Sequence, residues 1–196
     1  MASTTGTRDR ILFASAELMR RGGYAGTGLK QVVTASGAPF GSLYHFFPGG
    51  KEQLAEEVLR GGGSFFLALF EHIADEADGD VVAMVESFFA GAAETVRVTD
   101  YQDACPIATV ALEVASTNET LRSTCAEVFT SWLDAATRRF EEAGIPKDRA
   151  RLLSLTMLSA LEGAFVLART LRDTSALDAA GAAMAHATRR ALADRG

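Results

Sequence analysis

The chain has 196 residues, of which 48% are hydrophobic, a formal net charge of −6, four prolines and two cysteines. This length is enough to bury a substantial core, as one larger domain or as two small ones. We expect no transmembrane segment, because no apolar run is both long and pure enough to cross a bilayer. The first ten residues lack the apolar core of a signal peptide, which favours a cytoplasmic protein with Cys105 and Cys125 as reduced thiols. A disulfide or redox switch is the alternative for the two cysteines.

The first expected helix covers about residues 7–21. Thr7 is the predicted N-cap, and the apolar residues of this segment recur with helical spacing. The pair Gly22-Gly23 then ends it. The next stretch, residues 29–54, reads LKQVVTASGAPFGSLYHFFPGGKEQL and predicts two short helices followed by the start of a third.

A tight turn separates the two short helices of this stretch. Gly37 can end the first helix in the left-handed conformation at little steric cost. Pro39 has a fixed φ and no N–H, so it suits the first turn of the second helix. Leu43 and Phe46, three residues apart, would hold that helix inward and leave its other positions exposed.

A short helix braced across its neighbour can enter the major groove of DNA. The alternative is an ordinary helical corner in an all-α protein. Gly41 and Ser42 are small enough for close approach to a groove, and polar neighbours offer donors to phosphates and base edges. The predicted DNA-binding residues are Thr27, Lys30, Pro39, Phe40, Gly41, Ser42, Tyr44, His45 and Lys51.

Charge is distributed unevenly along the chain. Residues 1–51 contain six basic and two acidic residues, a net charge of +4, whereas residues 52–196 carry 13 basic and 23 acidic residues, a net charge of −10. A positive end would neutralise phosphates, and a negative body would be repelled by a duplex. A chance fluctuation of surface charge is the alternative explanation.

Residues 7–55 resemble the TetR family of bacterial transcriptional repressors. The matching pieces are Thr-Gly-Leu at 27–29, Gly-Ser-Leu-Tyr-His-Phe-Phe at 41–47 and Lys-Glu-Gln-Leu at 51–54, in the order typical of that family. The segment PGGKEQL, followed later by Cys-Pro-Ile-Ala at 105–108, is similar to the LmrA/YxaF-like branch.

Two positions depart from the family pattern. Val33 stands where the family usually has a small alanine, and its extra bulk could shift the angle between the two short helices. Phe40 stands where a lysine or arginine is common, so one phosphate contact is in doubt. Phe40 could touch a thymine methyl group instead, or it could be a partly buried surface residue.

Further helices follow from the breaks in the sequence. A long helix should run from Lys51 to about residue 75. It contains three consecutive glycines, Gly61-Gly62-Gly63, which have low helix propensity and form either a flexible joint or a place of close helix packing. Later helices are expected at about 80–98, 105–116, 118–143, 147–171 and 173–193, with Asn118 capping one and residues 173–175 capping the last. The sequence therefore predicts an all-α fold: a three-helix helix-turn-helix DNA-binding domain at 1–50, and a helical ligand-binding and dimerisation domain at 51–196.

The body contains two candidate functional surfaces. Aromatic and methionine side chains at helical spacing are usually core, but large flexible side chains also suit a small-molecule pocket. The family resemblance implies such a pocket for an inducer, with Glu162 as a residue that could orient a cationic ligand or else face solvent or an interface. The residues predicted to line it are Phe66, Phe88, Cys105, Phe129, Trp132, Met157 and Glu162.

The second surface is the C-terminal pair of helices. Small residues allow helices to approach closely, so the pair could complete a four-helix interface across a two-fold axis, or pack only within one chain. The resemblance favours a homodimer. The predicted interface residues are Leu155, Ser159, Gly163, Val166, Ala180, Ala183 and Ala187.

The function predicted from these features is a ligand-responsive repressor that binds a palindromic operator as a dimer and is released by a small, largely apolar effector. We expect neither a cofactor nor a metal, because His45, His72 and His186 have no metal-ligand spacing, and no nucleophile–base arrangement points to an enzyme. A helical ligand-binding or scaffold protein without operator binding is the alternative.

Overall fold

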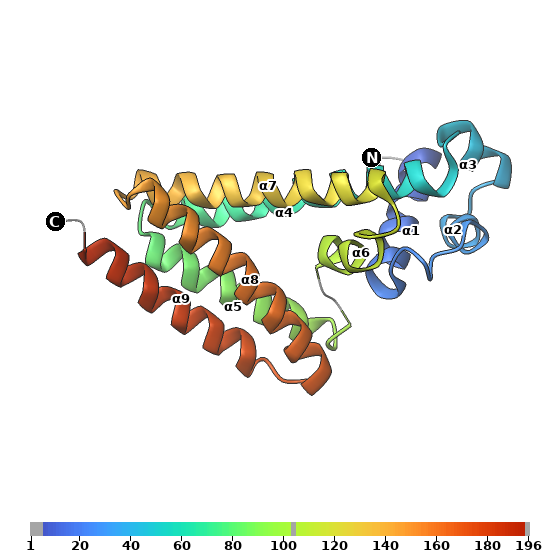
Figure 1. Ribbon diagram of the computed structural model, residues 1–196. Coiled ribbons are helices and arrows are strands. Elements are labelled where there is room, and N and C mark those ends of the chain that lie inside the picture. Colours follow the sequence, from blue (N-terminus) through green and yellow to red (C-terminus); the bar gives the residue numbers. More distant parts are fainter. Residues whose placement is uncertain (1–5, 103–104, 195–196) are drawn as a thin grey trace, which may run out of the picture. The chain divides into compact units, whose positions relative to one another are not determined.

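The structure is a computed structural model that describes residues 6–102 and 105–194. Residues 1–5, 103–104 and 195–196 lie outside the described residues. The described residues form helices and no strands, which confirms the all-α prediction (Figure 1). The helices are α1 (Thr7–Gly22), α2 (Leu29–Ser36), α3 (Phe40–Phe46), α4 (Gly50–Glu76), α5 (Val81–Val98), α6 (Pro106–Val114), α7 (Glu119–Glu142), α8 (Lys147–Leu171) and α9 (Ser175–Ala193).

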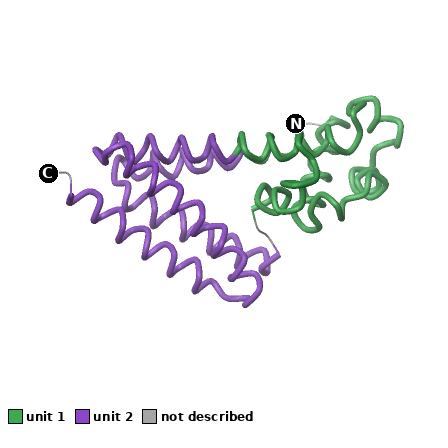
Figure 2. Tube along the Cα trace, viewed as in Figure 1, with its two compact units in different colours: residues 1–64, 105–128 green, residues 65–104, 129–196 purple. Residues whose placement is uncertain are grey.

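The chain divides into two compact units, coloured separately in Figure 2. Unit 1 contains residues 1–64 and 105–128, and unit 2 contains residues 65–104 and 129–196. The packing therefore does not divide the chain at residue 50, because α4 runs on past that point and α6 packs against α1. The functional division at residue 50 stays a prediction.

Unit 1 has its own small core around the three N-terminal helices. Its buried members come from each of these helices, from the connections on either side of α3 and from the start of α4, so the short helices are held by long-range packing and not by their own propensity. These buried residues are Ile11, Val32, Ala38, Leu43, Phe47 and Leu54.

Unit 2 is a helical layer in which α9 packs against both α5 and α8. Gly181 of α9 lies against Phe89 of α5, where a Cβ at Gly181 would stand 2.8 Å from the Cβ of Phe89. Both α8 and α9 bury one apolar side in this core and leave the other exposed.

One described helix, α8, is apolar enough to resemble a membrane span by length and composition. One window of this helix has a mean hydropathy of 1.5 and passes the length and composition test for a membrane span, with 39% of the window buried. Its buried residues, among them Leu153, Met157 and Phe165, belong to the core of unit 2. Core helices of this kind pass the same test, so α8 is weak evidence for a membrane span.

The helix ends largely match the sequence signals. Gly37 ends α2 with φ 61°, in the left-handed region as predicted. Asn118 caps α7, since its Oδ1 accepts the backbone N–H of Leu121 at 2.9 Å. One cap was wrong: Gly6 is the N-cap of α1, and Thr7 is its first helical residue.

The triple glycine leaves α4 unbroken. Gly63 is buried, and a Cβ there would stand 2.6 Å from Cγ1 of Val128 on α7. By contrast, a Cβ at Gly61 would meet nothing within 4 Å. Of the two explanations left open for this segment, close helix packing is therefore confirmed at Gly63.

Candidate nucleic-acid interface

The turn between α2 and α3 is closed by local hydrogen bonds. The hydroxyl of Ser36 donates to the carbonyl of Val33 at 3.1 Å and accepts the N–H of Ala38 at 3.3 Å. Pro39 occupies the N-cap of α3, where its lack of an N–H costs nothing. Leu43 is fully buried, so α3 is oriented by its inner side and presents the remaining side outward.

The outward side of α3 contains the side chains that the sequence placed there. Phe40 is 47% exposed and Tyr44 is 49% exposed, and their ring centroids lie 5.7 Å apart. His45 and Gly41 are exposed as well, whereas Ser42 is half-buried. Two aromatic rings and an imidazole on a seven-residue helix make a surface that can contact base edges and phosphates.

Gly41 is not required by the packing of the protein. A Cβ at this position would meet nothing within 4 Å, and its φ lies outside the left-handed region. Glycine in a helix weakens it by about 1 kcal/mol relative to alanine. A glycine that is both costly and sterically unnecessary suits a helix that another molecule must approach closely.

Thr27 differs from the other predicted DNA-binding residues. It is only 1% exposed, and its hydroxyl donates to the carbonyl of Gly23 at 2.8 Å. The side chain therefore stabilises the loop between α1 and α2 in this structure. Lys30 is exposed at the start of α2, and Pro39 is exposed at the start of α3.

Lys51 lies at the start of α4 and turns toward that loop. Its Nζ donates to the carbonyl of Ala25 at 3.5 Å and lies 4.4 Å from the centroid of the Tyr24 ring. Burial, and secondarily the carboxylate of Glu52, raises the pKa of Tyr24. Tyr24 is thus a neutral aromatic platform for the Lys51 ammonium.

The cations of the N-terminal helices fall into two groups. Arg8 pairs with Glu57 of α4, and Arg21 pairs with Glu17. Among the described residues, Arg10, Lys30 and Lys51 belong to none of the ion pairs. These three are therefore the cations most readily available to phosphates.

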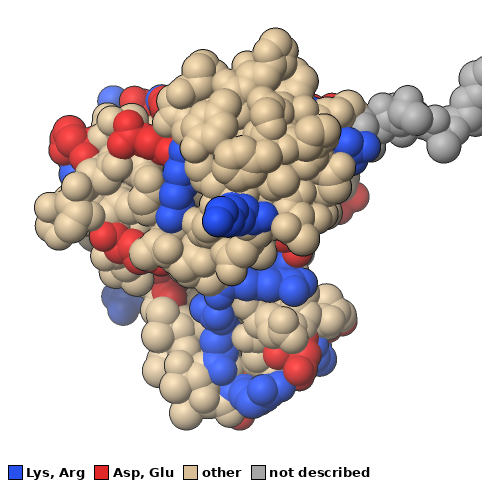
Figure 3. All heavy atoms as spheres, turned by 90° about the vertical axis from the view of Figure 1, so that its right-hand side faces the viewer, with Lys and Arg blue, Asp and Glu red and all other residues tan. Residues whose placement is uncertain are grey.

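Counted over the whole of unit 1, the charge asymmetry disappears. Residues 1–64 and 105–128 contain eight basic and eight acidic residues, because α4, α6 and α7 add six acids to this unit. Figure 3 turns the side of α2 and α3 toward the viewer, and there Lys and Arg stand singly or in short strings between broad neutral areas. Attraction to DNA would thus depend on the placement of a few cations, and not on a strongly basic surface.

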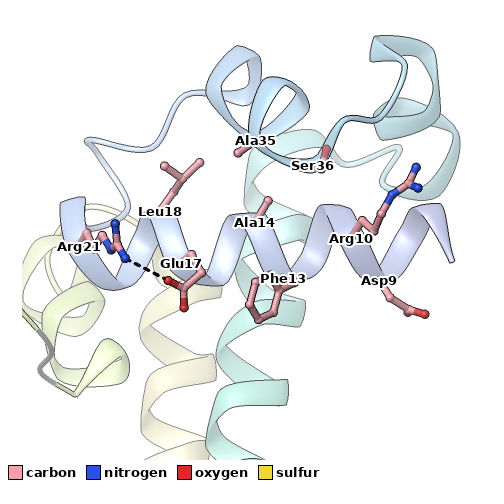
Figure 4. Close-up of a pocket in the computed structure, with 9 residues that line it drawn as sticks. All are labelled: Asp9, Arg10, Phe13, Ala14, Glu17, Leu18, Arg21, Ala35 and Ser36. Carbon is pink, nitrogen blue, oxygen red and sulfur yellow. Dashed lines mark ion pairs between the residues drawn. The ribbon is translucent and has the colours of Figure 1, made fainter. Parts of the chain in front are cut away.

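Unit 1 also has an open groove beside α1, with a volume of 780 Å³. Phe13, which is 70% exposed, and Leu18 line it together with Ala35 of α2, and Arg10 and Arg21 also line it (Figure 4). The sequence reasoning did not single out this groove. The available signal in the sequence was a phenylalanine at helical spacing from the charged residues Asp9, Arg10 and Glu17.

The predicted ligand-binding residues fall into separate places. Trp132 lies between Phe66 and Phe129, with ring centroids 5.8 and 5.6 Å away. Phe88 packs instead against Phe70, with ring centroids 5.5 Å apart. Both aromatic groups belong to unit 2, as do the buried Met157 and the half-buried Glu162, whereas Cys105 belongs to unit 1 as the N-cap of α6. An effector pocket among these residues stays a prediction.

The predicted dimer residues separate by helix. Leu155, Ser159, Gly163 and Val166 of α8 are exposed on one side of that helix. In α9, Ala183 is exposed, whereas Ala180 and Ala187 are half-buried against the core of unit 2.

The fold and this site define a helix-turn-helix DNA-binding protein with a helical C-terminal part. Residues 11–58 match the model of bacterial regulatory proteins of the tetR family, and residues 81–183 match the C-terminal domain of LmrA/YxaF-like transcriptional regulators. The chain belongs to the TetR family of transcriptional regulators, in its LmrA/YxaF-like branch.

Relatives cover nearly the whole chain. It is 36% identical over 177 residues to the uncharacterised regulator YxaF of Bacillus subtilis, covering 90% of this chain and 92% of YxaF. It is also 32% identical over 173 residues to the regulator LmrA of the same species, covering 87% of this chain and 90% of LmrA. A TetR regulator from Legionella pneumophila has the same fold, with a TM-score of 0.84 at 20% identity over 95% of this chain and 98% of that one.

Proposed function

We propose that this chain is a cytoplasmic, ligand-responsive repressor that binds a palindromic operator as a homodimer and is released by a small, largely apolar effector. The observation that carries the proposal is the outward side of α3, where Gly41 lacks a side chain for no internal packing reason between the exposed Phe40 and Tyr44. Lys30 and Lys51, which lie outside the ion pairs of the described residues, supply cations for phosphates.

The exposed apolar side of α8 supports the homodimer. Leu152, Leu155, Val166, Leu167 and Leu171 are each between 44% and 65% exposed. Contiguous apolar surface of this kind is uncommon on a monomer and marks an interaction site. A second copy packed on it would form a self-complementary interface across a two-fold axis.

The aromatic cluster of Phe66, Phe129 and Trp132 supports an apolar effector. All three side chains are half-buried, so their rings are only partly covered by the protein. Partly covered aromatic rings favour flat or apolar ligands over small polar ones. Glu162 would select for a cationic group on such a ligand.

The mechanism couples the two sites through dimer geometry. Two α3 helices, one from each protomer, enter successive major grooves of a palindrome. The effector binds more tightly to a geometry whose helices no longer match the groove spacing, and it acts only through that difference in affinity.

The test is a gel shift with the duplex upstream of the protein's own gene, followed by variants of the shifted site. Tyr44→Ala and Lys51→Ala should each weaken binding measurably, while Phe65→Ala, which removes an aromatic ring 66% exposed in unit 2, should leave it unchanged. Scrambling one half of the palindrome should weaken binding sharply. If Tyr44→Ala and Lys51→Ala bind as well as the wild type, α3 and α4 are not the DNA-binding surface. If no duplex is shifted, the ligand-binding or scaffold alternative holds.

A further inference from the structure

The loop between α1 and α2 is held from α6, a helix far away in the sequence. Glu113, in the last turns of α6, accepts the backbone N–H of Ala25 through its Oε2 at 2.7 Å. The two residues are 88 positions apart but belong to the same compact unit. A backbone N–H bonded to a carboxylate is a charge-assisted hydrogen bond, which is stronger and more directional than one to a neutral acceptor.

Gly23 makes room for this carboxylate. It adopts φ 70°, and a Cβ at this position would fall on Oε1 of Glu113, well inside van der Waals contact. The absence of a side chain at Gly23 is therefore a requirement of both the backbone conformation and the Glu113 side chain. At Gly37, Gly50 and Gly79, which also have positive φ, a Cβ would meet nothing closer than 3.9 Å.

The same loop holds a predicted phosphate-binding cation. The carbonyl of Ala25 accepts a hydrogen bond from Lys51, and the ring of Tyr24 lies under the same ammonium group. One peptide segment thus receives Glu113 on its N–H side and Lys51 on its carbonyl side. A second polar link supports the arrangement, because Asn118 donates to Glu52, the neighbour of Lys51, at 2.6 Å.

We propose that Glu113 is a positioning residue for operator binding: its carboxylate holds the α1–α2 loop through Ala25, and the loop holds Lys51. This inference rests on the proposed operator binding and adds a residue that contacts no DNA itself. The hydrogen bond is exposed, so its contribution is to the placement of the loop more than to the stability of the fold.

The sign of the effect separates positioning from charge. Glu113 is an acid in the DNA-binding unit, so removing its charge would by itself strengthen attraction to phosphates. If Glu113 instead acts by positioning the loop, a variant that cannot accept the Ala25 N–H should bind the operator more weakly. Glu113→Ala should therefore weaken operator binding by about three- to tenfold, whereas Glu113→Gln, whose amide oxygen can still accept the N–H, should bind as tightly as the wild type or more tightly.

A substitution on the other side of the contact should repeat the loss. Gly23→Ala displaces the Glu113 carboxylate and should weaken operator binding by about as much as Glu113→Ala. Gly79→Ala is the matched control, because Gly79 has φ 83° with nothing within 4 Å of a Cβ, so it adds backbone strain alone. Asp9→Asn controls for the loss of one negative charge from unit 1 and should not weaken binding.

The coupling to Lys51 is measured by a double-mutant cycle on operator affinity. In a Lys51→Ala background, Glu113→Ala should cost less than it does in the wild type, whereas in a Tyr44→Ala background it should cost the same. Equal affinities of the wild type and Glu113→Ala, or tighter binding by both Glu113 variants, would overturn the proposal.

The contact is also tested without DNA. In the free protein, Glu113→Ala should shift the amide resonance of Ala25 and raise the acylation rate of the Lys51 amine, while Glu113→Gln should leave both close to wild type. An unchanged Ala25 amide in Glu113→Ala would overturn the positioning role whatever the DNA result. If the wild type bound no operator, the proposed function would fail separately, and the amide and acylation measurements would still decide whether Glu113 holds the loop and Lys51.

Discussion

Gly63 of α4 lies directly against Val128 of α7, so that a Cβ at Gly63 would stand 2.6 and 2.7 Å from the two γ-carbons of the valine. The valine is β-branched and buried, so it has little freedom to move away. The close contact with Val128 explains why α4, a helix of 27 residues, has a glycine at position 63 in its interior.

Replacing Gly63 should destabilise the protein, although alanine is the better helix former. We expect Gly63→Ala to lower the free energy of unfolding by about 1–3 kcal/mol through overpacking. Gly61→Ala, two residues away and without a neighbour within 4 Å, should instead raise it by up to about 1 kcal/mol. Urea unfolding followed by circular dichroism measures both, and equal effects at the two positions would contradict the packing assignment.

Replacing Gly41 should stabilise the fold but weaken operator binding. Gly41→Ala should raise the free energy of unfolding by up to about 1 kcal/mol, yet weaken operator binding, because the added methyl group lies on the side of α3 that approaches DNA. Gly91→Ala in α5 is the control, since a Cβ there also meets nothing within 4 Å. It should stabilise the fold and leave DNA affinity unchanged. Tight operator binding by a folded Gly41→Ala protein would remove α3 from the interface.

Cations outside the ion pairs should contribute to the salt dependence of binding. Lys30→Ala should weaken operator binding and reduce the slope of log K against log salt by about 1. Arg60 already pairs with Glu56 and Glu127, so Arg60→Ala should change the slope much less. The measurement is fluorescence anisotropy between low and moderate salt, and identical slopes for the two variants would refute the division of cations.

The exposed side of α8 predicts a change in oligomeric state. Val166→Glu places a charge where a second copy would pack, so sedimentation should give a monomer at concentrations at which the wild type is a dimer. Leu112→Glu in α6, at a position 83% exposed, is the control for an added surface charge and should sediment as the wild type does. A dimeric Val166→Glu protein would place the interface elsewhere.

Cys125 should be inert at neutral pH. Burial raises the pKa of its thiol to about 11, so the thiolate that reacts with alkylating agents is scarce. In a Cys105→Ser background, iodoacetamide at pH 8 should modify Cys125 only after denaturant is added.

The same pKa sets a pH dependence of stability. The pKa of Cys125 in the folded protein lies above the ordinary value of 9.0. The contribution of the buried, protonated thiol to the free energy of unfolding is therefore fully present below pH 9 and is lost as the pH rises towards about 11. Cys125→Ala in the same background should remove this part of the alkaline loss. Unfolding curves at pH 8 and pH 10.5 that shift equally for both proteins would contradict it.

The local sequence was sufficient for most of the secondary structure. Gly37, Pro39 and Asn118 act within a few residues of their own position, so their effects on helix ends were readable without the fold. The inward Leu43 and the outward Tyr44 followed from helical spacing alone. The cap of α1 was missed, because Gly6 and Thr7 both suit a helix start and the choice depends on the backbone conformation of each.

The site was predicted less completely, for a related reason. Residue type alone suggested that Thr27 could contact DNA, but whether a hydroxyl faces a groove or a carbonyl depends on how the loop folds. Glu113 gave no signal in the sequence, since an acid near the end of a helix is usually solvated. Likewise, the net positive charge of residues 1–51 was real, but the acid that pairs with Arg8, Glu57, comes from a later helix.

The sequence by itself determined the order of the helices, the turn before α3, the outward side of that helix and the membership of the TetR family, because each depends on neighbouring residues or on an ordered motif. The tertiary structure alone decided which glycine of three must remain a glycine, which cations stay outside ion pairs and which distant carboxylate holds the loop at Ala25. Those features depend on atoms brought within contact distance across as many as 88 positions of chain, and packing sets such distances where local propensity does not.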